Sequence, residues 1–234
     1  MSLATLLVLA DGRLPAGGHA HSGGLEAAVS AGRVRDVTDV GEFLRGRLFT
    51  AGLVTAAFAA TACARPDRLS ELDDGLDART PSPALRKASR AQGRALLRAA
   101  RAMWPVPPAG RATDSGLRAG HAMWSAPAVG RELHHPVALG AVAAAAGLGP
   151  VEAAVAAAHG SVTGPASAAV RLLGLDPYAV HALLARLAPD CDRIAAQAAG
   201  RIDDPVDALP AAGAPLLDIG AEQHATWEVR LFAS

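Results

Sequence analysis

Residues 36–64 read DVTDVGEFLRGRLFTAGLVTAAFAATACA, and this stretch decides the fold class. Its apolar side chains recur at steps of three and four residues, which is the spacing of one face of an α-helix. They are Val37, Val40, Leu44, Leu48, Ala51, Val54 and Phe58. Asp36 is a residue type that caps helices, and Arg65-Pro66 ends the run because proline cannot continue a helix. The stretch therefore predicts one long amphipathic helix.

Capping signals predict two further helices in the middle of the chain. Ser82-Pro83 places a capping hydroxyl before a proline at the first helical position, and we expect this helix to run to Trp104. Residues 134–136, His-His-Pro, begin another helix, which Gly147 ends. Between the two helices, residues 105–116 contain three prolines and two glycines and are expected to form a loop.

Proline also marks the helices that follow. An alanine-rich helix begins at Pro150, and we expect it to bend or break between Gly160 and Pro165, because proline removes a helical hydrogen bond. Asp176-Pro177 repeats the cap-then-proline start and precedes an apolar stripe. The stripe consists of Val180, Leu183, Leu184 and Leu187. A separate last helix is expected around residues 190–200.

The composition agrees with an all-α fold. Hydrophobic residues make up 51% of the 234 residues and aromatic residues only 3%, so the core must consist of Ala, Leu and Val. Small side chains allow helices to approach closely, and no alternating strand pattern or repeat competes with the helical signals. Neither side of the loop at 105–116 carries a complete core. We therefore expect a single all-α domain, a multi-helix bundle over residues 1–234.

Charge and cysteine content narrow the class of protein. The 22 basic and 22 acidic residues balance, whereas nucleic-acid-binding proteins usually have a strong basic excess. Two cysteines, Cys63 and Cys191, are too few for a disulfide framework. No window reaches 18 uninterrupted apolar residues, and residues 1–10 lack the basic start of a secretion signal. We expect a cytoplasmic protein that contacts neither nucleic acid nor membrane.

The opening segment is rich in glycine and histidine. Residues 9–26 read LADGRLPAGGHAHSGGLE and hold two Gly-Gly pairs around His19 and His21. Glycine is used where the backbone needs a positive φ or a close approach, so a shaped turn is expected here. Ser22 offers a capping hydroxyl, and Glu26 places a carboxylate in the first turn of the helix that follows.

This segment resembles the N-terminal signature of the urease accessory protein UreF family, an LPxGGFxHSxGLE-like run. Further family-like segments follow in the same order. They are residues 88–93 (ASRAQG), 135–140 (HPVALG), 167–172 (SAAVRL) and the closing His224 with residues 230–234 (RLFAS). His19 stands where the family usually has an aromatic residue, and residues 173–176 (LGLD) replace the family's Pro-Leu-Gly-Gln.

The resemblance implies a function without catalysis. UreF-like proteins are homodimeric helical chaperones that bind the accessory protein UreD, also called UreH, and with it recruit the GTPase UreG. The assembly delivers nickel to urease apoprotein. On this interpretation the chain is an adaptor with no catalytic residue, metal site or cofactor of its own, and its partners are UreD/UreH, UreG and urease.

The resemblance also implies that the N-terminal segment and the C-terminal tail engage a partner. The residues expected to do so are His21, Ser22, Gly24, Glu26, Ser167, Arg171, Trp227, Arg230, Leu231 and Phe232. Trp, Arg and Phe are residue types common at interface hot spots. Residues 216–234 mix apolar and polar side chains without a long helical period, and an ordered tail of this kind must dock on something. It could equally dock on its own domain.

The histidines leave an alternative function open, a direct nickel carrier. His19 and His21 could bind one ion, and His134 or His135 could add a ligand, since imidazole suits nickel. Neither pair has the helical i, i+4 spacing or the nearby cysteine that makes a metal site credible. Loop and helix-start roles therefore remain the favoured interpretation of these residues.

Catalytic motifs are missing from the sequence. It contains neither the phosphate-binding pattern GxxxxGK[ST] nor the nucleophile pattern GxSxG. A hydrolase centred on Ser22 ranks last among the possible functions, because Ser22 has no acidic companion in a recognisable order.

A basic stripe follows one face of the helix expected after Ser82. It consists of Arg86, Arg90, Arg94, Arg98 and Arg101. Like charges at this spacing oppose helix formation and need compensation. The acidic residues between Glu71 and Asp77 lie just upstream and could fold back against the stripe, or the stripe could bind an acidic partner. The intramolecular interpretation is slightly favoured.

Overall fold

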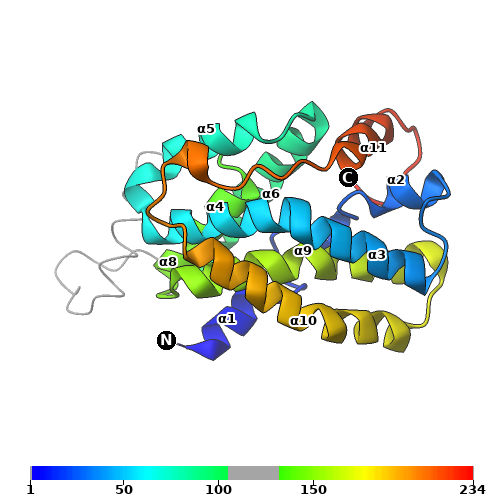
Figure 1. Ribbon diagram of the computed structural model, residues 1–234, viewed down its shortest axis with the longest axis horizontal. Coiled ribbons are helices and arrows are strands. Elements are labelled where there is room, and N and C mark those ends of the chain that lie inside the picture. The colour runs from blue at the N-terminus through cyan, green and yellow to red at the C-terminus, as the bar shows by residue number, and fades with distance from the viewer. Residues whose placement is uncertain (1, 105–131, 234) are drawn as a thin grey trace.

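The computed structural model describes residues 2–104 and 132–233, and this part is helical and contains no strand (Figure 1). The helices are α1 (Leu3–Leu9), α2 (Leu25–Ser30), α3 (Val37–Arg47), α4 (Leu53–Ala64), α5 (Leu69–Ala78), α6 (Pro83–Met103), α8 (His135–Ala145), α9 (Pro150–Leu173), α10 (Pro177–Ala199) and α11 (Pro215–Ala225). The all-α prediction is confirmed. The loop expected at residues 105–116 lies outside the described residues.

The long helix predicted from residues 36–64 is present. α3 continues through a π-helical turn, Leu48–Gly52, into α4 without interruption. The Asp36 carboxylate caps its start by accepting hydrogen bonds from the backbone N–H groups of Thr38 and Asp39, both at 2.9 Å. Short 3-10 turns elsewhere lie at Gly18–Ala20, Pro66–Arg68 and Val206–Ala208.

The α3–α4 run is long and apolar enough to span a membrane by length and composition alone. However, 61% of its most apolar window is buried inside the bundle. A helix in the middle of a helical protein needs apolar residues on most of its sides. The hydropathy of this run is therefore accounted for by its place in the core.

The core is built around α4, which packs against α8, α9 and α10. Figure 1 shows α3 and α4 crossing in front of α9, with α10 along one side. The buried side chains of α4 are mostly alanines, so its neighbours come very close. At Gly140 of α8, an added Cβ atom would lie 2.2 Å from the backbone oxygen of Ala59. Alanine and glycine thus set the separation of the central helices.

The predicted starts of α6 and α8 are confirmed. Ser82 caps α6 by accepting a hydrogen bond from Leu85 N at 3.1 Å, and Pro83 occupies the first turn. α8 begins at His135, with Pro136 in its first turn, and Gly147 lies just past its end with a φ of 75°. Proline at a helix start and glycine beyond a helix end are the expected arrangement.

Two predictions about where helices end need correction. The break considered between Gly160 and Pro165 is absent, because α9 runs through Pro165 as one helix. α10 likewise runs through Pro189, so the separate helix expected around residues 190–200 is the second half of α10. A proline inside a helix removes one hydrogen bond, and packing on both sides of the helix can compensate for this loss.

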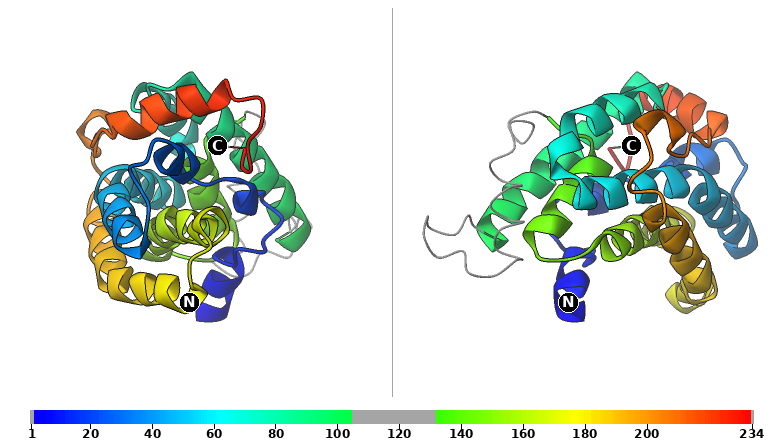
Figure 2. Two further views of the ribbon diagram at one scale, coloured as in Figure 1. Left: turned by 90° about the vertical axis from the view of Figure 1, so that its right-hand side faces the viewer. Right: turned by 60° about the vertical axis from the view of Figure 1, so that its left-hand side comes forward.

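α11 was not predicted, because residues 216–234 lack a long helical period. It lies beside α2 and packs against α2 and α6, and the C-terminal end of the chain is close by (Figure 2). The Glu222 carboxylate accepts hydrogen bonds from the Ser82 hydroxyl and from Ala84 N at the start of α6. Gly220 allows α11 to approach Ala27 of α2. Tertiary contacts rather than helical periodicity therefore hold α11 in place.

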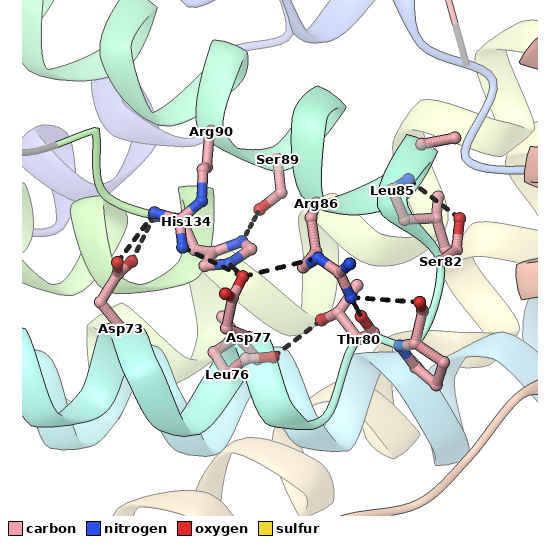
Figure 3. A network of polar contacts seen from close by, with 12 residues as sticks. Asp73, Leu76, Asp77, Thr80, Ser82, Leu85, Arg86, Ser89, Arg90 and His134 are labelled. Carbon is pink, nitrogen blue, oxygen red and sulfur yellow. Dashed lines mark hydrogen bonds and ion pairs between the residues drawn. The ribbon is translucent and has the colours of Figure 1, made fainter.

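Two members of the basic stripe, Arg86 and Arg90, pair with the acidic residues just upstream, as the intramolecular interpretation predicted. Arg90 donates to Asp73 at 2.8 Å and to Asp77 at 3.0 Å, and Arg86 lies 3.8 Å from Asp77 (Figure 3). Asp73 is fully buried and also accepts a hydrogen bond from His134 N at 2.7 Å. This network joins α5, α6 and the segment that enters α8.

The two kinds of pair in the stripe should differ in strength. Arg90→Met is expected to lower the free energy of unfolding by about 2 kcal/mol, because it leaves the buried Asp73 without its cation. Arg94→Met removes a more exposed pair with Glu132 and should cost less than about 1 kcal/mol. Urea unfolding at 0.1 M and 0.5 M NaCl would check this. Equal costs, or a strong salt dependence at Arg90, would contradict it.

Candidate partner-docking site

The glycine pairs of the opening segment form the shaped turn that the sequence predicted. Gly23 and Gly24 have φ values of 62° and 90°, a region that other residues rarely adopt. The turn places the buried Ser22 hydroxyl at the start of α2, where it accepts a hydrogen bond from Glu26 N at 3.2 Å. The Ser22 hydroxyl thus satisfies an N–H group of the first turn as expected, although the N-cap residue itself is Gly24.

The carboxylate of Glu26 binds the C-terminal tail. One of its oxygens accepts a hydrogen bond from Leu231 N at 2.7 Å, and the other accepts from Phe232 N at 3.0 Å. His224 Nε2 lies 2.8 Å from the second oxygen. Burial alone would raise the pKa of the Glu26 carboxyl, but the bonds from Leu231, His224 and Phe232 outweigh it, and the pKa lies below its ordinary value. Glu26 is therefore an ionised clamp for the tail.

Arg171 of α9 joins the same two segments from the other side. Its Nη2 donates to the backbone oxygen of His19 at 3.0 Å, and its guanidinium lies over the Phe232 ring, 4.5 Å from the centroid. Ala233 N also donates to the backbone oxygen of Ala20 at 2.7 Å. We call the meeting point of residues 17–26, Arg171 and residues 224–233 the junction.

Most of the predicted site residues meet at the junction. Ser22, Glu26, Arg171, Leu231 and Phe232 take part in the contacts described above. The ring of Trp227 lies against that of His224, with centroids 4.8 Å apart.

The remaining predicted residues lie at the edges. Arg230 is exposed on the tail, His21 is half-buried in the turn, and Ser167 is exposed on α9, four residues before Arg171. Gly24 lies against the Leu217 side chain of α11, because an added Cβ atom would be 2.9 Å from Leu217 Cδ2. The prediction did not include His224 among the site residues, although its place in the family-like closing segment was a usable signal.

An apolar groove with a volume of about 400 Å³ lies beside the junction, between α2, α3 and the start of α11. Its apolar wall includes Ala28, Val34, Phe43, Leu216 and Leu217. On the tail itself, Val229 is 90% exposed and Leu231 60% exposed. An apolar groove and exposed apolar side chains are both features found on surfaces that bind other proteins.

The histidines divide between different environments. His134 is buried, and its two ring nitrogens lie 3.0 Å from the Ser89 hydroxyl and 2.8 Å from Asp77. Because both nitrogens are engaged, His134 is not available to bind an ion together with His19 and His21. Within residues 2–104 and 132–233, no group of three or more His, Cys, Asp or Glu side chains is arranged to hold a metal ion.

His135 should make the fold sensitive to acid. Burial, and secondarily the charge of His21, lower the pKa of His135 from 6.5 to about 4. Between these values the unfolded chain binds a proton that the folded chain does not, so stability present above pH 6.5 is lost as the pH falls toward 4. From pH 7 to pH 5 the loss from this group is expected to be about 2 kcal/mol.

Urea unfolding of the wild type and His135→Asn at both pH values would measure this loss. The variant should lose less stability than the wild type by about the same amount. An identical pH dependence in the two proteins would contradict the assignment to His135.

Known proteins resemble this chain over nearly its whole length. The UreF family model matches residues 34–188. The urease accessory protein UreF of Mycobacterium sp. strain JLS is 47% identical, covering 100% of this chain and 99% of that protein. The UreF proteins of Mycolicibacterium vanbaalenii and Mycobacterium tuberculosis strain H37Rv are 44% and 41% identical, covering 100% and 95% of this chain and 99% and 94% of those proteins. The chain therefore belongs to the UreF family of urease accessory proteins.

Proposed function

We propose that this chain is a non-catalytic adaptor of urease maturation that binds UreD/UreH and, with it, recruits the GTPase UreG for nickel insertion into urease apoprotein. On this proposal it acts in the cytoplasm as a homodimer, with residues 1–234 as one domain and with no cofactor of its own. It contacts neither nucleic acid nor membrane.

The observation that carries this proposal is the junction. The family-like N-terminal and C-terminal segments are clamped to each other, and the clamp leaves the Val229 and Leu231 side chains facing outward. An interface needs a central apolar patch on a pre-organised surface, and the junction with its groove supplies both. We propose that the partner-binding residues are His21, Ser22, Gly24, Glu26, Ser167, Arg171, Trp227, Arg230, Leu231 and Phe232.

Co-expression with UreD/UreH and UreG from the same source would test the proposal. We expect a complex whose mass corresponds to two copies of this chain together with both partners. A chain that purifies without either partner would contradict the adaptor function.

Surface variants would locate the interface within that complex. Leu231→Gln changes an exposed side chain to a neutral polar one and keeps the backbone hydrogen bond to Glu26, so the fold should persist while UreD/UreH binding weakens at least tenfold. Val151→Gln is the matched control, since Val151 is an exposed apolar residue at the far end of α9 from Arg171. Equal affinities of the two variants would exclude the tail from the interface.

The alternative function, nickel carriage by this chain itself, has less support because His134 is engaged by Ser89 and Asp77. It depends on His19 and His21. Calorimetric titration of the purified chain with Ni²⁺ would decide it, with a chain in which both residues are replaced by alanine as the control. Tight binding in the wild type that the double variant loses would favour this alternative.

A further inference from the structure

Pro165 leaves one backbone oxygen of α9 without its helical partner. In an α-helix the carbonyl of Ser161 would accept a hydrogen bond from the N–H of residue 165, and proline has none. A buried carbonyl without a donor is costly. A donor from elsewhere in the fold would remove this cost at the Ser161 carbonyl.

Arg47 supplies the missing donor. Its Nε donates to the Ser161 carbonyl at 3.0 Å, and its Nη1 donates to the Gly23 carbonyl at 2.8 Å. Burial lowers the pKa of Arg47 to about 10, and no carboxylate of the described residues forms an ion pair with it. The guanidinium is therefore held mainly by these two backbone oxygens, one on α9 and one on the N-terminal turn.

Two glycines, Gly52 and Gly23, leave room for the contact between Arg47 and α9. Arg47 is followed at once by the π-helical turn Leu48–Gly52, in which an added Cβ on Gly52 would lie 2.9 Å from the Ser161 hydroxyl. On Gly23, an added Cβ would lie 2.9 Å from Pro165 Cγ and 3.2 Å from Arg47 Cζ. The N-terminal turn thus rests directly on both Pro165 and Arg47.

We propose that Arg47 and Pro165 are positioning residues of the junction. Pro165 frees the Ser161 carbonyl, this carbonyl anchors Arg47, and Arg47 holds the Gly23 turn so that Ser22 and Glu26 face the tail. That Arg47 and Pro165 hold the turn does not depend on the proposed function. Only the identity of the partner that docks at the junction rests on it. Because Arg47 also lines the apolar groove, the same side chain connects the groove to the turn.

Hydrogen exchange on the full-length chain without partners tests the positioning role. Arg47→Met removes both hydrogen bonds and keeps an unbranched apolar stem, so amide exchange in residues 21–26 should accelerate about tenfold or more. Arg45→Met is the matched control, because Arg45 lies on the same helix but is exposed. Val142→Ala in the core of α8 controls for a general loss of stability. Arg47→Lys keeps a cationic donor group but concentrates it on one nitrogen, so it should retain part of the protection.

A double-variant cycle tests the link to Pro165. Pro165→Ala provides an N–H for the Ser161 carbonyl, so losing Arg47 should cost less stability in that background than in the wild type. Costs that simply add would overturn the inference, as would equal exchange of residues 21–26 in Arg47→Met and either control. If Pro165→Ala does not fold, hydrogen exchange of residues 21–26 in the Arg47 variants decides whether Arg47 positions the turn.

The result is separable from that of the proposed function. If the wild type binds no UreD/UreH, the adaptor proposal fails, whereas exchange in the isolated chain still decides the role of Arg47. If the wild type does bind, Arg47→Met should weaken binding about as much as it loosens the turn. A loosened turn with unchanged affinity would overturn the role of Arg47 in docking.

Discussion

Replacing Glu26 with alanine is expected to lower the free energy of unfolding by about 3 to 4 kcal/mol. The change leaves the part-buried N–H group of Leu231, the buried N–H group of Phe232 and the ring of the buried His224 without their acceptor. Residues 226–233 should then detach from α2 before the rest of the chain unfolds. Urea unfolding measures the energy, and limited proteolysis with mass spectrometry measures the release of the tail.

A control variant on the same tail and the pH dependence of stability show whether the Glu26 effect comes from the clamp. Glu228→Ala alters an exposed carboxylate on the same tail and should change stability by less than about 0.5 kcal/mol. Because the pKa of Glu26 is lowered on folding, its contribution is present above the ordinary carboxyl pKa and is lost as the pH falls through the folded value. The Glu26→Ala protein should therefore lose less stability in acid than the wild type. A tail that stays protease-resistant in Glu26→Ala would contradict the clamp.

Gly140→Ala should be as damaging, although it adds a single methyl group to a helix. Alanine normally favours a helix over glycine by about 1 kcal/mol. At Gly140, however, the methyl would meet the Ala59 oxygen at 2.2 Å, the Ala62 Cβ at 2.8 Å and the Cys63 nitrogen at 2.9 Å. Two of these atoms are backbone atoms of α4 and the third is a Cβ atom, and none of them can rotate away. The helices α4 and α8 must therefore separate. We expect a loss of about 3 kcal/mol or more.

Gly160→Ala provides the matched control within another long helix. Nothing lies within 4 Å of a Cβ added at Gly160, so this variant should gain up to about 1 kcal/mol from helix propensity. Thermal unfolding of the two variants should shift in opposite directions. Similar shifts would show that close packing at Gly140 does not determine the separation of α4 and α8.

Local signals in the sequence predicted the elements whose causes are themselves local. The cap at Asp36 and the apolar steps to Phe58 lie within one helix, so periodicity and capping chemistry located that helix. The same holds for the start of α6 at Ser82. These features depend only on residues a few positions apart.

The wrong or missing helix predictions depend on contacts between residues that are far apart in the sequence. Pro165 indicates a helix break unless a donor from elsewhere satisfies Ser161, and that donor is 114 residues distant, on Arg47. α11 depends on Glu222 reaching the start of α6, 138 residues away at Ala84. Neither contact can be inferred from the periodicity of a short stretch of sequence.

The sequence predicted which residues belong to the candidate site but not how they contact one another. Residue types and family resemblance selected Glu26, Arg171 and Phe232, and the structure brings all three together. That Glu26 accepts the backbone N–H groups of the tail could not be predicted, because main-chain donors carry no residue-specific signal. Of the two roles expected of the tail, docking on its own chain is shown, and binding a partner stays a prediction. The tail docks on α2 through its backbone while side chains such as Val229 face outward.

The span of the clamp has a consequence for how the protein is made. Glu26 contacts Leu231 and Phe232 across 205 and 206 residues, so the junction cannot form until both have left the ribosome. Every shorter nascent chain presents an α2 whose carboxylate is still uncovered. A partner that recognises the assembled junction would therefore distinguish a chain synthesised past Phe232 from one interrupted before it.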